Sequence, residues 1–203
     1  MPSVAVLAAV VFAGLWIGVA LNWSWLTAAD TSTLGRFHDF GVHHPLWIRL
    51  WRLVSDVLSP NVLRIAGLVC IVIALIRRRK RVAGFLAVTV IPAGLVTAVA
   101  KGVSDRPRPE TALTHAASSS FPSGHALGIT VGVLAFGVLL WPRVTASMRG
   151  PVIALGAALI GLVGLSRGAL NVHYPSDVVA GCALGLLYYL LCVLLVPPSV
   201  TQT

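Results

Sequence analysis

Long apolar stretches separated by short polar connections dominate this chain of 203 residues. Six of them stand out, at Val4–Leu21, Val62–Ile76, Val82–Ala100, Ala126–Trp141, Val152–Leu165 and Val178–Val196. A helix that crosses the hydrocarbon core of a bilayer needs about 17–25 mostly apolar residues. The pattern therefore predicts an all-α, polytopic membrane protein with six transmembrane helices.

Several of these runs are too short to span a bilayer alone, so their helices must extend into flanking residues. We expect the second helix to begin before Pro60 or to stand steeply, and the fifth to continue past Leu165. No Lys or Arg precedes Val4, and no A-x-A-like site closes the first run convincingly. We therefore expect that run to remain as a helix rather than to be removed as a signal peptide.

The composition supports a membrane protein and argues against other classes. Hydrophobic residues make up 57% of the chain and charged residues only 10%, whereas soluble domains carry about 25% charged residues. The formal charge is +9, but five of the basic residues form one run, Arg77–Arg81, beside an apolar segment. Such a run is typical of membrane topology or anionic lipid contact, and we expect no nucleic-acid partner. The three cysteines lie in apolar runs and predict neither a disulfide nor a metal site.

The distribution of basic residues predicts the orientation. The Arg77–Arg81 run lies between the second and third apolar segments, and Arg143 and Arg149 lie between the fourth and fifth. By the positive-inside rule both connections are cytoplasmic. The connections 101–125 and 166–177 then lie together on the extracytoplasmic side.

The connection between the first two segments, 22–60, is long and rich in tryptophan, which favours the membrane–water interface. Within it, residues 46–58 alternate as an amphipathic helix would, with Leu46, Leu50 and Leu53 apart from Arg49 and Arg52. This pattern predicts a structural helix that lies in the interface.

Three polar segments interrupt the apolar pattern: Lys101–Pro109, Ser120–His125 and Ser166–Asp177. They supply four cations, two histidines, two aspartates and a Ser-Gly turn before a helix, but no cluster of carboxylates for Mg²⁺. Arginine matches phosphate oxygens in a bidentate manner and lysine adds a point charge. The backbone N–H groups of a helix start near Ser123 and Gly124 also suit an anion. The inventory favours a phosphate site without a metal.

His173 and Asp177 are four residues apart, and a helix that starts near Pro175 would let Asp177 face His173. A histidine oriented by an aspartate is a base or a nucleophile, which leaves His125 to act as the acid. Each feature alone has a structural alternative. The histidine–aspartate pair could be a structural hydrogen bond, and the cations could extend to the membrane interface without binding a ligand. The gathering of all three polar segments on one side favours function, because polar groups in a bilayer are costly.

The three segments resemble the tripartite signature of the type 2 phosphatidic acid phosphatase (PAP2) superfamily, K-x6-R-P, P-S-G-H and S-R-x5-H-x3-D. Here the signature reads Lys101…Arg108-Pro109, Pro122-Ser123-Gly124-His125 and Ser166-Arg167…His173…Asp177, with every position matched in spacing and order.

The resemblance implies a role for each of these residues. His173 would be the nucleophile that forms a phosphohistidine, Asp177 its orienting partner and His125 the acid that protonates the leaving oxygen. The phosphate cradle would consist of Lys101, Arg108, Arg167, Ser123 and Gly124, and the family needs no metal or other cofactor. Arg106 lies outside the signature, and a second phosphate or the lipid headgroups are equal alternatives for it. Glu110 and His115 receive no role.

We therefore expect one domain over residues 1–203, with its signature at 101–177, in the cell membrane and with its active site at the extracytoplasmic interface. Its expected activity is hydrolysis of a lipid phosphate or pyrophosphate, such as a polyprenyl pyrophosphate, phosphatidylglycerophosphate or phosphatidate. The alternatives are a phosphotransferase that uses a second lipid as acceptor, a vanadate-dependent haloperoxidase, whose membrane-free architecture disagrees with the hydropathy, and a lipid-binding or flipping protein without catalysis. The expected partners are the lipid substrate and the bilayer, and no pattern defines an oligomeric state.

Overall fold

The computed structural model describes residues 2–116 and 118–198, which form helices and no strands. The α-helices are α1 (Pro2–Ala20), α2 (Ser24–His43), α3 (Pro45–Val57), α4 (Pro60–Ile76), α5 (Lys80–Thr89), α6 (Ala93–Ser104), α7 (Gly124–Leu140), α8 (Arg149–Ala169) and α9 (Pro175–Leu195). Two 3-10 turns, η1 (Trp141–Arg143) and η2 (Ala146–Met148), connect α7 to α8. The predicted all-α class is confirmed.

Six helical stretches are long and apolar enough to cross a membrane, which confirms the predicted number. They are Pro2–Ala20, Pro45–Ile76, Lys80–Ser104, Gly124–Arg143, Ala146–Ala169 and Pro175–Leu195. The second begins before Pro60 and the fifth continues past Leu165, as the short apolar runs require. Many apolar side chains of α1 and α4 are exposed on the outside of the bundle, including Leu7, Val10, Ile65 and Leu68. These faces are suited to lipid rather than to water.

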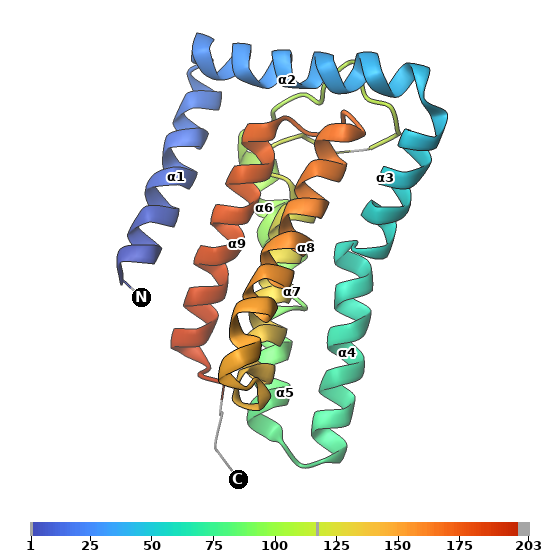
Figure 1. Ribbon diagram of the computed structural model, residues 1–203. Coiled ribbons are helices and arrows are strands. Elements are labelled where there is room, and N and C mark those ends of the chain that lie inside the picture. The colour runs from blue at the N-terminus through green and yellow to red at the C-terminus, as the bar shows by residue number, and fades with distance from the viewer. Residues whose placement is uncertain (1, 117, 199–203) are drawn as a thin grey trace.

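Helices α7 and α9 pack closely in the middle of the bundle (Figure 1). Glycines make this possible, because a Cβ on Gly181 would lie 2.4 Å from the carbonyl oxygen of Ser123. A Cβ on Gly185 would lie 2.9 Å from the carbonyl oxygen of Leu127. The close approach sets the start of α9 directly beside the start of α7, where two of the predicted polar segments meet.

The third span is broken, although its sequence predicts one continuous segment. Helix α5 ends at Thr89 and α6 begins at Ala93, with Pro92 between them. Proline lacks the N–H that a continuous helix would use and its ring clashes with the preceding turn, which accounts for the break.

The expectation of an interfacial helix over residues 46–58 is wrong. Helix α3 turns away from the end of the bundle and continues end to end into α4, whereas α2 lies across that end (Figure 1). The amphipathic pattern of α3 has another cause. Leu46, Leu50 and Leu53 are exposed on the outside, and Arg52 lines a cavity inside the bundle.

The two polar connections are shorter than the sequence suggests, because helices extend into both of them. Lys101 lies in the last turn of α6, and Arg167 lies in the last turn of α8. The remaining described segments, 105–116, 118–123 and 170–174, pass beneath α2 at the same end of the bundle (Figure 1). The basic run Arg77–Arg81 lies at the opposite end, at the turn between α4 and α5.

Candidate active site

His173 lies in the short connection between α8 and α9 and is buried. Asn171, in the left-handed conformation that asparagine tolerates, reverses the chain after α8. The side-chain amide of Asn171 donates to the carbonyl oxygen of Leu34 on α2 and to the hydroxyl of Thr111. The backbone N–H of Val172 donates to the carbonyl of Arg167. The loop that carries His173 is therefore held from two sides.

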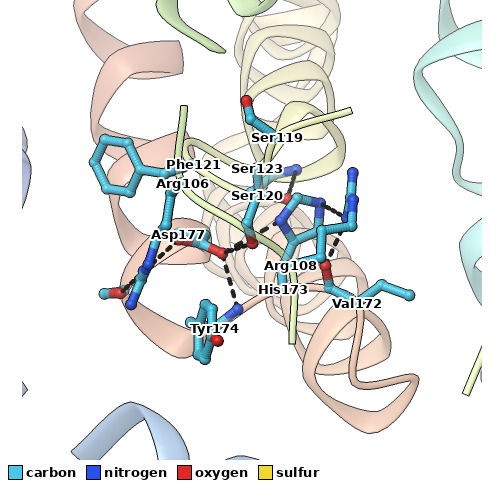
Figure 2. A network of polar contacts seen from close by, with 12 residues as sticks. Arg106, Arg108, Ser119, Ser120, Phe121, Ser123, Val172, His173, Tyr174 and Asp177 are labelled. Carbon is cyan, nitrogen blue, oxygen red and sulfur yellow. Dashed lines mark hydrogen bonds and ion pairs between the residues drawn. The ribbon is translucent and has the colours of Figure 1, made fainter. Parts of the chain in front are cut away.

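Asp177 faces the first ring nitrogen of His173, at 3.5 Å from Oδ2 to Nδ1. The carboxylate also accepts the backbone N–H of Tyr174 at 2.9 Å and the hydroxyl of Ser120, and so caps the start of α9 (Figure 2). Pro175 opens that helix at its first turn, where the missing N–H costs nothing. Nδ1 has no other polar partner among the described residues, so this geometry favours the tautomer with its proton on Nδ1.

Arg108 faces the second ring nitrogen of the same histidine, with Nη1 at 3.3 Å from Nε2 (Figure 2). Its guanidinium is held by carbonyl oxygens: Nη1 donates to Val172 at 2.5 Å and Nε donates to Ser118 at 2.7 Å. An unprotonated Nε2 thus lies beside a cation, which would direct an anion toward that nitrogen.

A cavity of about 590 Å³ opens on this face of His173. Five of the predicted site residues with charged or titratable side chains line it, together with Gly124. They are Lys101, Arg108, His125, Arg167 and His173. Asp56 is the one carboxylate among the described residues that line the cavity.

Lys101 and Arg167 are held by neutral oxygens, as Arg108 is. The ammonium of Lys101 donates to the carbonyl of Ser119, and Nη1 of Arg167 donates to the hydroxyl of Ser55 on α3. Nε of Arg167 is buried without a partner among the described residues. None of the ion pairs found in the described part of the chain involves these two cations or Arg108. Their charge remains available to an anionic ligand.

Ser123 and Gly124 have different positions. The hydroxyl of Ser123 accepts the backbone N–H of Ala126 at 3.5 Å and caps α7. Ser123 is fully buried and is not among the residues that line the cavity, whereas Gly124 is. The predicted phosphate contact of Ser123 therefore stays a prediction, and its observed role is to start the helix that presents Gly124 and His125.

Arg106 lies on the opposite side of Asp177 from His173 (Figure 2), and its contacts with the chain are ones that the sequence did not predict. Its guanidinium pairs with Asp177 at 2.6 Å and with Asp30 of α2 at 2.8 Å. It also donates to the hydroxyl of Ser176, which itself donates to Asp30, and it stacks on the ring of Tyr174. Arg106 thus contacts two carboxylates of the chain, and its contact with a second phosphate or with headgroups stays a prediction.

Sequence reasoning missed Asp30, as it missed the three residues of α3 that line the cavity, Arg52, Ser55 and Asp56. Asp30 is 2% exposed and accepts the backbone N–H of Ser176 at 3.0 Å in addition to Arg106. In the sequence it is an isolated carboxylate in the long connection after the first apolar run. No local spacing links it to a partner 76 residues away.

Burial and neighbouring charges set the protonation of the groups in the two connections. Burial lowers the pKa of His173 to about 4, and the opposing effect of Asp177 is too weak to cancel it. Burial also lowers the pKa of Arg106, but Asp177 and Asp30 outweigh this effect and raise it above its usual value. For Arg108 burial dominates and the pKa falls. At neutral pH His173 is therefore a neutral imidazole, and its Nε2 lone pair faces Arg108.

The two remaining polar residues of the region differ. His115 lines the cavity next to Thr114 and Ala116, and Glu110 does not. Neither had been given a role from the sequence. The position of His115 places it within reach of a bound ligand, and nothing in the structure assigns a function to Glu110.

The fold and the site together define a class: a multi-pass helical membrane protein with a histidine–aspartate pair beside a cavity lined by cations. The chain belongs to the PAP2 superfamily, since the model of that family matches residues 81–200. The matched region contains all three segments of the signature.

Several characterised proteins are similar to part of the chain. Phosphatidylglycerophosphatase B of Bacillus subtilis is 35% identical over 100 residues, which cover 48% of this chain and 49% of that protein. Lipid A 1-phosphatase of Rhizobium etli is 36% identical over 115 residues, 51% of this chain and 46% of the relative. Decaprenylphosphoryl-5-phosphoribose phosphatase of Mycobacterium tuberculosis is 41% identical over 66 residues, 32% and 31% of the two chains. The matches thus span half or less of these relatives.

One solved structure covers nearly the whole chain. It is the crystal structure of the first transmembrane PAP2 type phosphatidylglycerolphosphate phosphatase from Bacillus subtilis, with a TM-score of 0.76 over 93% of each chain at 23% identity. At this identity the likeness shows that the two proteins share a fold.

Proposed function

We propose that the protein is a membrane phosphatase that releases phosphate from a lipid phosphate or pyrophosphate through a phosphohistidine on His173. One observation carries the proposal: a buried neutral histidine has a carboxylate at Nδ1 and an arginine at Nε2, and Nε2 faces a cavity lined by further cations. A nucleophile oriented by an acceptor on its far nitrogen is the arrangement that covalent catalysis requires.

The first step follows from these positions. Lys101, Arg108 and Arg167 hold the nonbridging oxygens of the phosphoryl group and neutralise its charge. Nε2 of His173 bonds to phosphorus while the bond from phosphorus to the lipid oxygen breaks. His125 gives a proton to that oxygen, and the imidazolium formed on His173 keeps its Nδ1 proton toward Asp177.

The second step returns the enzyme to its starting state. Water attacks the phosphohistidine, the bond between Nε2 and phosphorus breaks, and the proton of the water passes to His125. Because the three cations already face the phosphate, we propose that no metal ion is needed. The described residues also hold no group of three or more His, Cys, Asp or Glu side chains suited to one.

The proposed substrates are phosphatidylglycerophosphate, phosphatidate or a polyprenyl pyrophosphate. The names of the similar proteins support a lipid phosphate, because each is a phosphatase of a glycerolipid, of lipid A or of a polyprenyl compound. The exposed apolar faces of the bundle keep the lipid tail of such a substrate in the bilayer while its phosphate reaches the cavity.

The experiment that tests the proposal separates the two histidines by their roles. His173→Ala abolishes phosphate release from both a lipid phosphate and nitrophenyl phosphate, because a nucleophile is needed with any leaving group. His125→Ala loses about 10²–10⁴-fold on the lipid, the usual value of general acid catalysis, and much less on nitrophenolate, which leaves unprotonated.

A rapid-mixing burst of nitrophenolate reports the first chemical step alone and removes any masking by slow hydrolysis of the phosphohistidine. A burst that survives in His173→Ala, or an equal deficit of His125→Ala on both esters, contradicts the assigned roles.

We further propose that the site faces the extracytoplasmic side of the cell membrane. The basic run Arg77–Arg81 and Arg143 lie at the end of the bundle away from the site, and basic ends favour the cytoplasm. In a variant without the three native cysteines, Ser118→Cys should react with an impermeant thiol reagent on intact cells, and Thr145→Cys should not. The reverse labelling would place the site on the cytoplasmic side.

A further inference from the structure

A second cavity, of about 230 Å³, adjoins the candidate active site between α4, α5, α6 and α7. Most of its lining is apolar or small, with Pro60, Leu63, Val90, Ala93 and Val131. Gly124 and His125 line both cavities, so the two spaces meet at the start of α7. Among the described residues that line the second cavity, Arg64 alone carries a permanent charge.

Arg64 lies deep in the membrane-spanning part of α4. It precedes Ile76, the last residue of that helix, by twelve positions, which is about 18 Å along the helix axis. The hydrocarbon core is about 30 Å thick, and an arginine near its centre costs about 2.5–3.5 kcal/mol on insertion scales. No ion pair of the described residues includes Arg64, and its Nη1 donates to Asn61 at 3.0 Å. A charge in this place without a carboxylate partner points to a ligand.

The guanidinium of Arg64 extends from α4 to α6. It lies against the backbone of Gly94, because a Cβ at Gly94 would be 2.0 Å from Nη2. Gly94 is three residues, or about 4.5 Å along α6, from Thr97. The methyl group of Thr97 in turn lies 2.8 Å from where a Cβ of Gly124 would be. The guanidinium therefore contacts α6 at Gly94, one helical turn before Thr97, the residue of α6 that packs against Gly124.

We propose that Arg64 and Asn61 form a second anion site, which binds the phosphate that departs with the lipid when the substrate is a lipid diphosphate. The proposal rests on the proposed function, in which His125 protonates the leaving oxygen. The leaving group then lies beyond His125, and the cavity with Arg64 begins there.

With a lipid diphosphate, Nε2 of His173 bonds to the terminal phosphorus and the bond from this phosphorus to the bridging oxygen breaks. The bridging oxygen accepts the proton of His125 and leaves as part of a lipid monophosphate, whose remaining charge Arg64 meets. With a lipid monophosphate the leaving group is a neutral alcohol, to which Arg64 offers no ionic contact. Arg64 thus favours a lipid diphosphate over the corresponding monophosphate.

The test compares kcat/KM for a polyprenyl diphosphate with that for the monophosphate of the same polyprenol, using purified protein in detergent. Arg64→Met should lower the ratio of the two values about 10- to 100-fold, the usual contribution of a charge-assisted hydrogen bond. Arg64→Lys should keep most of the ratio. Arg143→Met, the same change at the far end of the bundle, should leave the ratio unaltered.

The outcomes separate this inference from the proposed function. If Arg64→Met folds and the ratio of the two kcat/KM values does not change, the second anion site is overturned. The proposed phosphatase function is not affected by that result. No phosphate release by the unsubstituted protein from either substrate contradicts the phosphatase itself.

A second variant keeps the test open if Arg64→Met does not fold. Gly94→Ala retains the charge of Arg64 but pushes its flexible guanidinium away from the shared wall of the two cavities. It should lower the same ratio, and an unchanged ratio for Gly94→Ala overturns the proposal.

Discussion

Arg106 and Arg108 stand two residues apart in the same Arg-Pro repeat and lie on opposite sides of His173. Arg106 lies behind the histidine–aspartate pair and is neutralised by two carboxylates, at 2.6 and 2.8 Å. Arg108 lies in front, where its guanidinium is held by the carbonyl oxygens of Val172 and Ser118 and faces the cavity. The pKa of Arg106 is raised and that of Arg108 is lowered, which expresses the same contrast. The partners of an arginine, and not its charge alone, decide whether it positions a group or binds a ligand.

The same substitution at both positions should have opposite effects on activity and on stability. Arg108→Gln should lower kcat/KM for a lipid phosphate about 10²–10³-fold, the usual loss when one donor to a developing charge is removed. Its thermal stability should stay near that of the unsubstituted protein. Arg106→Gln leaves Asp30 and Asp177 buried without their cation, which typically costs about 3–5 kcal/mol of folding free energy. Enzyme assays and thermal unfolding in the same detergent measure both effects.

A control shows whether Arg106→Gln loses stability because the carboxylates lose their ion pairs or because the side chain changes its packing. Adding Asp30→Asn to Arg106→Gln removes one of the two orphaned charges and should restore part of the lost stability, since residues of one network are not additive. A stable, phosphate-binding-deficient Arg106→Gln, or an unstable Arg108→Gln, would reverse the assignment of the two arginines.

Sequence patterns predicted most of the cations and histidines that line the cavity, but not the pair of Asp30 and Arg106 behind Asp177. Lys101, Arg108, His125, Arg167 and His173 all line one cavity, because the signature spacings place them at the ends of helices that meet. Asp30 belongs to a distant helix, and only packing of α2 across the bundle brings it to Arg106. A charge pair at that separation has no local periodicity and cannot be predicted from one sequence.

In the fold, too, most features that depend on local sequence were predicted, and those that depend on packing between distant segments were not. Hydropathy predicted the six spans because a bilayer requires long apolar helices. Pro92 is present in the sequence, but the apolar run continues through it, and hydropathy alone therefore predicted an unbroken helix. The orientation of α3 was not visible, since an amphipathic pattern does not tell whether the polar face meets water or, as here, a polar cavity that Arg52 and Asp56 line.

A smaller effect is expected on the pH dependence of activity. Burial lowers the pKa of His173 to about 4. His173 attacks as the neutral base, so activity should hold as the pH falls from 7 and decline only near pH 4. Asp177 raises this pKa and Arg108 lowers it. The acid limb of kcat/KM for nitrophenyl phosphate should therefore move to lower pH in Asp177→Asn and to higher pH in Arg108→Gln.

Each variant is compared with the unsubstituted protein on the same ester, so that the titration of the substrate itself cancels. Shifts in the same direction for both variants would mean that the two side chains do not act on His173 from opposite sides.

The central claim is that Nε2 of His173 becomes bonded to phosphorus during turnover. A lipid phosphate labelled in its phosphoryl group is mixed with the enzyme for milliseconds and quenched in alkali, in which phosphohistidine survives, and the label is located by peptide mass spectrometry. We expect the label on the peptide that contains His173, and none in His173→Ala. Label on His125 or another residue, or turnover without any covalent label, would contradict the mechanism.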